Sequence, residues 1–261
     1  MKTLHSISIN IVNHCNLNCK YCDHFAPIAI EGCISVNKFK KDIKRLREIA
    51  HNNILSIDLM GGEPLLHPSI IRILEITREF FANSDIFIFT NGILLKDMNE
   101  DFWQSCRQNN ISITISKYPI NLNIEWIENK CAENNINLEF YTNPDSETKT
   151  MNFVPLDLRG LQDKEDSFAK CFQAKKCVLF NEGRIYTCSL AANIKYFNKY
   201  FKKNISQLKK DSISIYDVNE LSQIINYLNA PISLCKYCNI NARELSKSWE
   251  LSELSIDEWV K

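Results

Sequence analysis

The chain has 261 residues, of which 45% are hydrophobic, and its 31 basic side chains balance its 31 acidic ones. This length suffices for one large domain, or for a barrel-like domain with a small appendage, and the hydrophobic share argues against disorder. A formal net charge of +0 removes the positive surface with which proteins neutralise nucleic-acid phosphates, so we expect no nucleic-acid partner. No apolar run approaches the roughly 18 residues of a membrane helix, and no secretory signal precedes the first predicted strand. We therefore expect a cytoplasmic protein without a membrane partner.

The eleven cysteines are unusually many for a protein of the reducing cytosol. In that compartment they indicate metal or redox chemistry before disulfides. Cys15, Cys19 and Cys22 form a C-x3-C-x2-C run directly after residues 6–12, an apolar-alternating segment that predicts the first strand. Because structural zinc and structural iron-sulfur sites take four ligands, a loop with three thiolates leaves one coordination position open.

This run resembles the signature of the radical S-adenosylmethionine (SAM) superfamily, in which an aromatic residue precedes the last cysteine, as Tyr21 does here. The resemblance implies a 4Fe-4S cluster with three irons held by these cysteines and the fourth iron chelating the amino and carboxylate groups of SAM. It also implies an α/β fold, a partial (β/α)6 TIM barrel. The alternative is a structural zinc loop completed by His14 or His24.

Strand and helix signals alternate after the cysteine run. Ser35 is a candidate N-cap of the first helix, and Ser69 precedes the second. Further strands are predicted at residues 54–60, 85–89, 111–116, 137–142 and 151–156, and further helices at residues 97–108 and 124–134. This alternation indicates a parallel sheet with right-handed crossovers, in which functional residues lie at the carboxyl ends of the strands.

Three turns at such strand ends carry candidate cofactor-binding residues. A Gly-Gly-Glu-Pro turn lets backbone approach a ligand and supplies a carboxylate, which in the superfamily binds the amino group of SAM. Each candidate also has a purely structural explanation. The Gly-Gly-Glu-Pro segment could be an ordinary strand-to-helix turn, the Thr-Asn-Gly segment could be a common turn, and the serine could simply end a strand. By the resemblance, the cofactor-binding residues are Tyr21, Gly61, Gly62, Glu63, Pro64, Thr90, Asn91 and Ser116.

Residues 143–169 are polar and charged, and they predict a transition out of the barrel that could carry a substrate lid. Arg159 in this segment is a candidate substrate anchor, because a guanidinium makes planar, bidentate contacts with oxygens, although an exposed structural arginine fits equally well. We therefore divide the chain into a radical SAM barrel, residues 1–150, and a C-terminal part, residues 151–261.

The C-terminal part contains a second set of spaced cysteines, Cys171, Cys188, Cys235 and Cys238. A predicted hairpin at residues 178–187 lies between the first two, and the last two form a C-x2-C knuckle. The spacing resembles the twitch domain, the abbreviated form of the SPASM domain, which implies a second and fully ligated 4Fe-4S cluster. A zinc ion held by four thiolates satisfies the same ligand count.

Between these pairs of cysteines, residues 194–210 are rich in lysine. Ile194, Phe197 and Phe201 have helical spacing, so an amphipathic helix that covers the cluster is favoured over a site for a phosphate or an acidic peptide.

Together the two cysteine sets resemble those of radical SAM enzymes with one auxiliary cluster, such as the 2-deoxy-scyllo-inosamine dehydrogenases. The resemblance implies that SAM is cleaved to a 5′-deoxyadenosyl radical and that a small polar substrate, a sugar or cyclitol alcohol, is oxidised. The auxiliary cluster would accept the second electron, and a protein such as flavodoxin or ferredoxin would donate the first.

The sequence leaves other functions open. An epimerase would need a hydrogen donor, for which Cys177 is the candidate; Cys33, Cys106 and Cys131 are also unassigned, although buried inert thiols are commoner. A peptide-modifying maturase would normally carry a leader-binding extension, and we expect none before the first strand. The alternative outside the enzymes is a zinc-stapled binding module, which a metal analysis would separate from an iron-sulfur protein.

Overall fold

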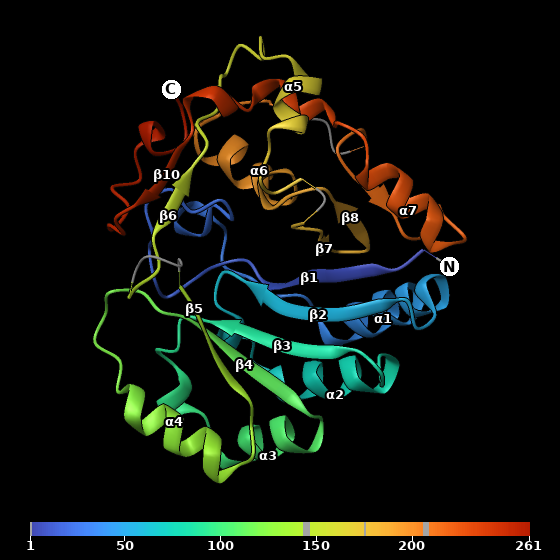
Figure 1. The fold of residues 1–261 in the computed structure, drawn as a ribbon, viewed down its shortest axis with the longest axis vertical. Coiled ribbons are helices and arrows are strands. Elements are labelled where there is room, and N and C mark those ends of the chain that lie inside the picture. The colour runs from blue at the N-terminus through green and yellow to red at the C-terminus, as the bar shows by residue number, and fades with distance from the viewer. Residues whose placement is uncertain (1, 143–146, 175, 206–208) are drawn as a thin grey trace.

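The computed structural model describes residues 2–142, 147–174, 176–205 and 209–261 (Figure 1). The strands are β1 (Leu4–Val12), β2 (Ile54–Gly61), β3 (Asp85–Thr90), β4 (Ile111–Ser116), β5 (Leu138–Tyr141), β6 (Met151–Phe153), β7 (Leu179–Asn181), β8 (Arg184–Tyr186), β9 (Ile213–Ser214) and β10 (Glu244–Lys247). The α-helices are α1 (Val36–Ala50), α2 (Ile70–Phe80), α3 (Glu100–Gln108), α4 (Ile124–Glu133), α5 (Lys164–Ala169), α6 (Ser189–Tyr200) and α7 (Leu221–Leu228).

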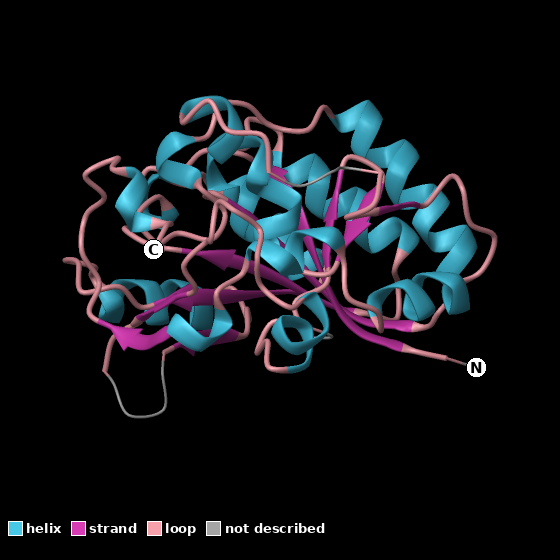
Figure 2. Ribbon diagram, turned by 90° about the horizontal axis from the view of Figure 1, so that it is seen from above, coloured by secondary structure: helices cyan, strands magenta, loops and turns pink. Residues whose placement is uncertain are grey.

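The main sheet runs in the order β5-β4-β3-β2-β1-β7-β8-β9. β1 to β5 pair in parallel as neighbours in sequence order, and β7 pairs in parallel with the other edge of β1. Figure 2 shows the strands fanning out as a curved sheet flanked by helices. This mostly parallel arrangement agrees with the predicted partial (β/α)6 TIM barrel, because helical crossovers join the parallel strands.

The first helix begins where its sequence predicts. The Ser35 hydroxyl accepts a hydrogen bond from the backbone N–H of Lys38 at 3.3 Å, which caps α1. Phe39 and Ile43 on its apolar face are fully buried in the same core as Ile7 of β1. The amphipathic pattern therefore fixes which side of α1 packs on the sheet.

The two faces of β1 differ in chemistry. Ile7 and Ile9 are buried in the core beneath the helices, whereas Ser6 and Ser8 lie on the opposite face, as the two-residue period of a strand requires. Both serine hydroxyls donate to the carboxylate of Asp58 on β2, at 2.7 and 3.4 Å. The concave face of the sheet is thus polar, which suits a ligand cavity better than a filled barrel interior.

The prediction of a sixth barrel strand at residues 151–156 is wrong in its placement. β6 pairs antiparallel with β10 in a separate two-stranded sheet. Its alternating pattern buries Met151 and Phe153, and the Phe153 ring packs on the ring of Tyr21 with centroids 4.7 Å apart. These contacts place β6 against the cysteine run instead of beside β5.

The predicted hairpin takes the place next to β1 instead. β7 and β8 pair antiparallel across Glu182 and Gly183, whose φ angles of 50° and 79° are both positive, as the tight turn of a two-residue hairpin requires. Ser8 and Ile9 of β1 pair with Leu179 and Phe180 of β7. The C-terminal cysteine region therefore extends the sheet of the barrel; the division of the chain at residue 150 stays a prediction.

The first part of the lysine-rich segment, residues 194–200, lies in α6 with Ile194 and Phe197 buried, so an amphipathic helix is confirmed there; residues 206–208 lie outside the described residues. The predicted transition segment contains β6 and α5, and its residues 143–146 also lie outside them. Among the helices that the structure describes, none is long and apolar enough to cross a membrane.

Candidate functional site

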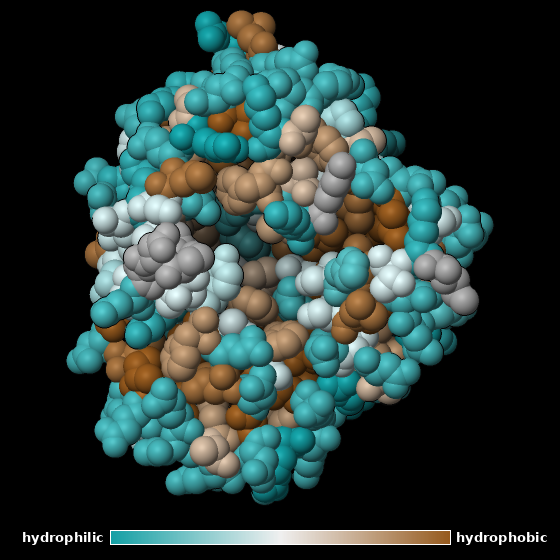
Figure 3. All heavy atoms as spheres, in the orientation of Figure 1, coloured by the Kyte–Doolittle hydropathy of each residue, from teal (hydrophilic) through white to brown (hydrophobic). Residues whose placement is uncertain are grey.

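A large cavity opens at the carboxyl ends of the parallel strands. Figure 3 shows a hollow near the middle of the molecular face that is in view. The empty volume of the cavity is about 1520 Å³, counting the part that is open to solvent. Most of the predicted cofactor residues line it together with the first three cysteines: Cys15, Cys19, Tyr21, Cys22, Gly61, Gly62, Glu63, Thr90, Asn91 and Ser116. The sequence prediction that these strand ends meet on one face is therefore correct.

The two glycines after β2 hold the cysteine loop, which we define as residues 15–22. A Cβ atom at Gly61 would lie 2.1 Å from the backbone oxygen of Val12, and one at Gly62 would lie 1.9 Å from that of His14. Because neither glycine has a Cβ atom, the N–H groups of Gly62 and Glu63 can donate to the oxygens of Val12 and His14 at 2.8 and 2.9 Å. The glycines thus serve close backbone packing against the start of the cysteine loop.

The Glu63 carboxylate is the centre of a buried hydrogen-bond network. It accepts hydrogen bonds from the Thr90 hydroxyl at 2.7 Å, from the N–H of Asn91 at 2.9 Å and from that of Leu65 at 3.1 Å. Burial nevertheless raises the pKa of Glu63 to about 7, against the opposing effect of these donors. A cationic ligand in the cavity would favour the charged carboxylate.

Asn91 connects this network to the cysteine loop. Its side-chain amide donates to the Asn16 oxygen at 2.7 Å and to the Cys15 sulfur at 3.6 Å. The backbone N–H of Leu17 also donates to the Cys15 sulfur, at 3.3 Å. Donors that already point at a sulfur are suited to a metal-bound thiolate, which accepts hydrogen bonds better than a neutral thiol.

The three thiols of the cysteine loop are protonated unless a cation is present. Desolvation raises the pKa of Cys15 to about 12 and also raises the pKa of Cys19 and of Cys22. Because metals bind the thiolate form, iron would have to displace these protons on binding. The donor set fits an iron-sulfur cluster held by the three sulfurs.

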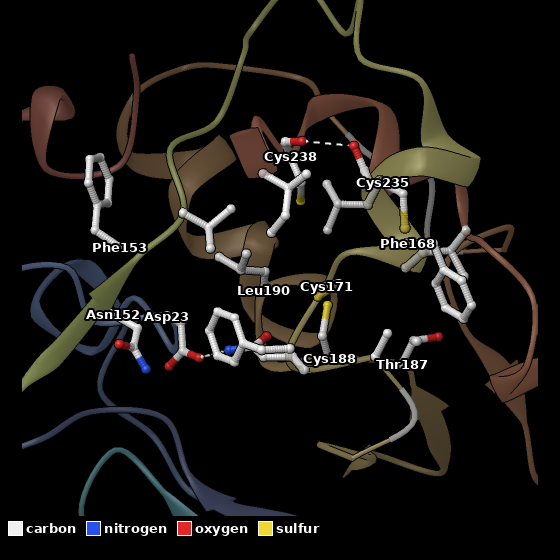
Figure 4. Close-up of a pocket in the computed structure, with 18 of the residues that line it drawn as sticks. Asp23, Asn152, Phe153, Phe168, Cys171, Thr187, Cys188, Leu190, Cys235 and Cys238 are labelled. Carbon is white, nitrogen blue, oxygen red and sulfur yellow. Dashed lines mark hydrogen bonds between the residues drawn. The ribbon is translucent and has the colours of Figure 1, made fainter. Parts of the chain in front are cut away.

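The second set of cysteines lines a separate, mostly apolar cavity of about 750 Å³, counting the part that is open to solvent (Figure 4). Cys171 follows α5, Cys188 precedes α6, and Cys235 and Cys238 lie in the chain after α7. Burial raises the pKa of Cys235 to about 11 and also raises the pKa of Cys188 and Cys238. The structure thus brings together all four cysteines that the sequence singles out for one site.

The four thiols do not converge as the ligands of a single ion do. In a zinc site, all four sulfurs lie about 2.3 Å from the metal. Within the described residues, no three cysteine, histidine or acidic side chains are arranged so that they could hold a single metal ion.

The two cavities share a wall. Asp23, next to Cys22, lines both cavities, and so does Gln173. The Asp23 carboxylate accepts hydrogen bonds from the Gln173 amide at 2.6 Å and from the Ser189 hydroxyl at 2.5 Å. Since Ser189 follows Cys188, one carboxylate joins the two cysteine sites directly.

Some predicted residues lie elsewhere. Arg159 points to solvent, with 77% of its side chain exposed, and pairs with Asp157 at 3.2 Å; it does not line either cavity. Pro64 begins a short 3-10 turn and also lies outside the cavity lining. Cys106 and Cys131 are buried in the apolar core, which is where inert thiols belong.

Cys177 lines the large cavity, as a hydrogen donor would have to. Although Cys177 is exposed, partial desolvation of its thiol and the nearby Asp23 carboxylate raise the pKa of Cys177, so the S–H form prevails near neutral pH.

Sequence reasoning missed several cavity residues. Asp58, which also accepts a hydrogen bond from Ser56 at 3.2 Å, lines the cavity with Lys149 and Tyr118. The signal for Asp58 was present, because serines alternate with isoleucines along β1 and would otherwise face an apolar interior. Lys149, whose ammonium lies 5.1 Å from the Tyr118 ring centroid, has no local signal in the sequence.

A partial barrel with a three-cysteine loop at its open end defines an α/β enzyme built around an iron-sulfur cofactor. The family model described as the radical SAM superfamily matches residues 9–144, more than half of the chain. The chain belongs to the radical SAM superfamily. It is therefore a radical SAM enzyme that uses SAM and a 4Fe-4S cluster, and the alternatives of a zinc-completed cysteine loop and of a zinc-stapled binding module are wrong.

Relatives with curated names match over part of their length. The GTP 3′,8-cyclase of Trichodesmium erythraeum (strain IMS101) is 31% identical over 127 residues, which cover 43% of this chain and 35% of the relative. That of Clostridium perfringens (strain 13 / Type A) is 27% identical over 178 residues, 60% of this chain and 54% of the relative. The chain thus spans about a third to a half of the length of these curated relatives.

Solved structures match over nearly the whole chain. BtrN in complex with AdoMet and 2-DOIA has a TM-score of 0.58 at 16% identity, covering 95% of this chain and 96% of that one. Native anSMEcpe with bound AdoMet has a TM-score of 0.53 at 13% identity, covering 89% and 82%. At such identities the likeness shows the fold alone, and it confirms the predicted fold class.

Proposed function

We propose that this protein is a radical SAM dehydrogenase that oxidises a small polar alcohol, a sugar or a cyclitol. When bound, the N-terminal cluster supplies the electron that cleaves SAM to methionine and a 5′-deoxyadenosyl radical, and a second cluster accepts one electron. The substrate loses a carbon-bound hydrogen atom to the radical, a hydroxyl proton and that electron, which together convert the alcohol to a ketone.

Cys15, Cys19 and Cys22 are the residues that we assign to the first 4Fe-4S cluster. The donors aimed at Cys15 from Asn91 and Leu17 support this assignment, because they would stabilise a thiolate. Three protein ligands leave one iron open for SAM.

Glu63 is the residue that we assign to the amino group of SAM. Its carboxylate is buried beside the cysteine loop, and its network with Thr90 and Asn91 fixes its position. An ammonium group would stabilise the charged carboxylate in this desolvated place. Tyr21, Gly61, Gly62 and Ser116 complete the proposed SAM end of the cavity.

Cys171, Cys188, Cys235 and Cys238 are the residues that we assign to the second 4Fe-4S cluster, in a twitch-type region. Four thiols around an apolar cavity of about 750 Å³ offer a closed ligand set, with no corner left for a substrate. The arrangement of the thiols favours a cluster over zinc, since a single ion would need them closer together.

The observation that carries the dehydrogenase proposal is the wall that the two cavities share. A substrate in the large cavity would contact Asp23 and Gln173, which also line the cavity of the second set of cysteines. An electron leaving the substrate would therefore have a short path to the second site. An enzyme that only transfers a hydrogen atom does not need this arrangement.

Hydroxyl-bearing substrates suit the remaining wall of the large cavity. Ser8, Asp58 and Ser189 also line it, and they offer both donors and acceptors. Polar groups that converge in a cavity of this kind select small molecules by hydrogen bonding.

The test is anaerobic reconstitution followed by turnover with a panel of sugar and cyclitol alcohols in heavy water. Iron at about eight atoms per chain supports two 4Fe-4S clusters, and about four supports one. Ketone and deoxyadenosine formed in equal amounts support the proposal. An inverted alcohol that carries solvent deuterium contradicts it.

That inverted product would support an epimerase, the second candidate. The position of Cys177 in the large cavity favours it, because a protonated thiol there could return a hydrogen atom to the substrate. Cys177→Ala would then abolish deuterium incorporation, whereas a dehydrogenase would retain its ketone product.

Two further points belong to the same experiment. GTP is included in the substrate panel because the partial relatives are named GTP 3′,8-cyclase, and a cyclised nucleotide would support that activity. We also propose that a cytoplasmic flavodoxin or ferredoxin supplies the electron, which replacing dithionite by such proteins would test.

A further inference from the structure

The C-terminal chain crosses the cysteine loop. We define residues 249–252 as the C-terminal strap. The Lys20 N–H donates to the Glu250 oxygen, and the Ser252 N–H donates to the Asn18 oxygen, both at 2.9 Å. Leu251 and Cys19 form an antiparallel bridge between them, and the Lys20 ammonium pairs with the Glu250 carboxylate at 2.7 Å. The strap is thus bonded to the loop from both sides of Cys19.

The strap brings a buried donor to Cys19. The indole nitrogen of Trp249 is buried and has no hydrogen-bond partner among the residues that the structure describes, and the ring packs in the apolar cluster that contains Cys19 and Leu17. Cys19 itself is only 5% exposed. A buried N–H without an acceptor is unfavourable. A neutral Cys19 thiol is a poor acceptor for the Trp249 N–H, and a metal-bound Cys19 thiolate would be a better one.

Tyr118 approaches the same sulfur. Its ring centroid lies 6.1 Å from that of Trp249, and both rings pack in the apolar cluster that contains Cys19. The ammonium of Lys149 lies 5.1 Å from the Tyr118 ring centroid, and Lys149, Tyr118 and Cys19 line the same cavity. Two polar side chains that can donate hydrogen bonds and one positive charge thus lie close to this sulfur.

We infer that Trp249, with Tyr118, donates a hydrogen bond to the Cys19 sulfur of the N-terminal cluster and raises the reduction potential of that cluster. Reduction adds negative charge to a cluster and its sulfurs, and a donor to a ligand sulfur stabilises the reduced form more than the oxidised form. The C-terminal strap would in this way set the reduction potential of the cluster that supplies the first electron of the reaction.

This inference rests on the proposed assignment of Cys19 as a cluster ligand, but not on any substrate. The potentials are measured on the reconstituted full chain without SAM and without substrate. Failure of the dehydrogenase proposal would therefore leave the result unchanged, and Cys19→Ala, which should lose the N-terminal cluster signal, tests the assignment separately.

The experiment is a redox titration followed by electron paramagnetic resonance. Trp249→Phe keeps an aromatic ring and removes the N–H; it should lower the midpoint potential of the N-terminal cluster and leave that of the second cluster unchanged. Tyr118→Phe should lower the same potential. Trp126→Phe is the matched control, because Trp126 lies on α4 and packs on Trp103.

A further variant separates the hydrogen bond from the fit of the strap. Glu250→Gln removes the ion pair with Lys20 but leaves the indole in place. An N-terminal potential that is unchanged in both Trp249→Phe and Tyr118→Phe overturns the inference. A decrease in Glu250→Gln as large as that in Trp249→Phe also overturns it, because loosening of the strap would then account for the effect.

Discussion

The two cysteine cavities differ in their cysteine sets and in their walls. The first contains the cysteine loop, with three proposed ligands, and a partly polar wall, whereas the second contains four proposed ligands and a mostly apolar wall. A closed ligand set can exchange only electrons, and an open one can also bind a reactant. The contrast therefore predicts that removing a cysteine from each cavity will block different steps.

The largest effects should come from a matched pair of cysteine variants. Cys15→Ala should reduce deoxyadenosine formation to background, because SAM needs the first cluster. Cys235→Ala should leave deoxyadenosine formation in place but abolish the ketone, because the second electron has no acceptor. The measurements are deoxyadenosine and ketone per chain, with the iron content of each variant as the control. Equal loss of deoxyadenosine in both variants would remove the distinction between the cavities.

Glu63→Gln should weaken SAM binding next most strongly. The change removes the charge that we assign to the SAM amino group, and a hydrogen bond to a charged group contributes about 1.5–3 kcal/mol, or roughly 10-fold to 150-fold in the dissociation constant. Equilibrium dialysis with radiolabelled SAM measures this directly. Glu79→Gln, on the exposed side of α2, is the control, and SAM binding as tight in Glu63→Gln as in this control would refute the assignment.

The same carboxyl group should make the stability of the SAM-free protein depend on pH. Its pKa is about 7 in the fold and 4.5 ordinarily, so the folded state binds the proton more tightly than the unfolded chain does. This stabilisation is fully present below pH 4.5 and is lost as the pH rises through about 7. The loss amounts to about 3 kcal/mol.

Urea unfolding of wild type and Glu63→Gln at several pH values tests this dependence. The free energy of unfolding of Glu63→Gln relative to wild type should increase by about 2.5 kcal/mol between about pH 5 and pH 8. A difference that stays constant over this range would mean that Glu63 is not desolvated in the fold.

The smallest effect concerns the shared wall. Ser189→Ala removes one hydrogen bond to the Asp23 carboxylate, and we expect the free energy of unfolding to fall by about 2 kcal/mol. Ser69→Ala serves as the control, because the Ser69 side chain makes no capping hydrogen bond, and its effect should stay within about 0.5 kcal/mol. Equal effects in the two variants would show that the wall contributes nothing specific.

The grouping of the cysteines could be predicted because it follows from their spacing in the sequence. Cys15, Cys19 and Cys22 lie within one loop, and the strand-end positions of Glu63 and Thr90 follow from the alternation of strands and helices. Each of these predictions needs only neighbours in sequence or a parallel sheet. The cavity lining agrees with both requirements.

Contacts between segments that are distant in the chain could not be predicted from the sequence. The partner of β6 is β10, almost a hundred residues later, and a three-residue strand carries no signal of where it pairs. Asp23, Gln173 and Trp249 each look like ordinary surface residues until the folded chain places them beside a cysteine site. Arg159 pairs with Asp157 at an exposed position and lines neither cavity, so its role as a substrate anchor stays a prediction.

The contrast between an open and a closed cluster is tested most directly by adding SAM to the dithionite-reduced, fully reconstituted protein and recording its electron paramagnetic resonance spectrum. We predict that the signal lost in Cys15→Ala changes on SAM addition, that the signal lost in Cys235→Ala does not, and that deoxyadenosine accumulates. If neither signal changes on SAM addition and no deoxyadenosine forms, the result would contradict the account.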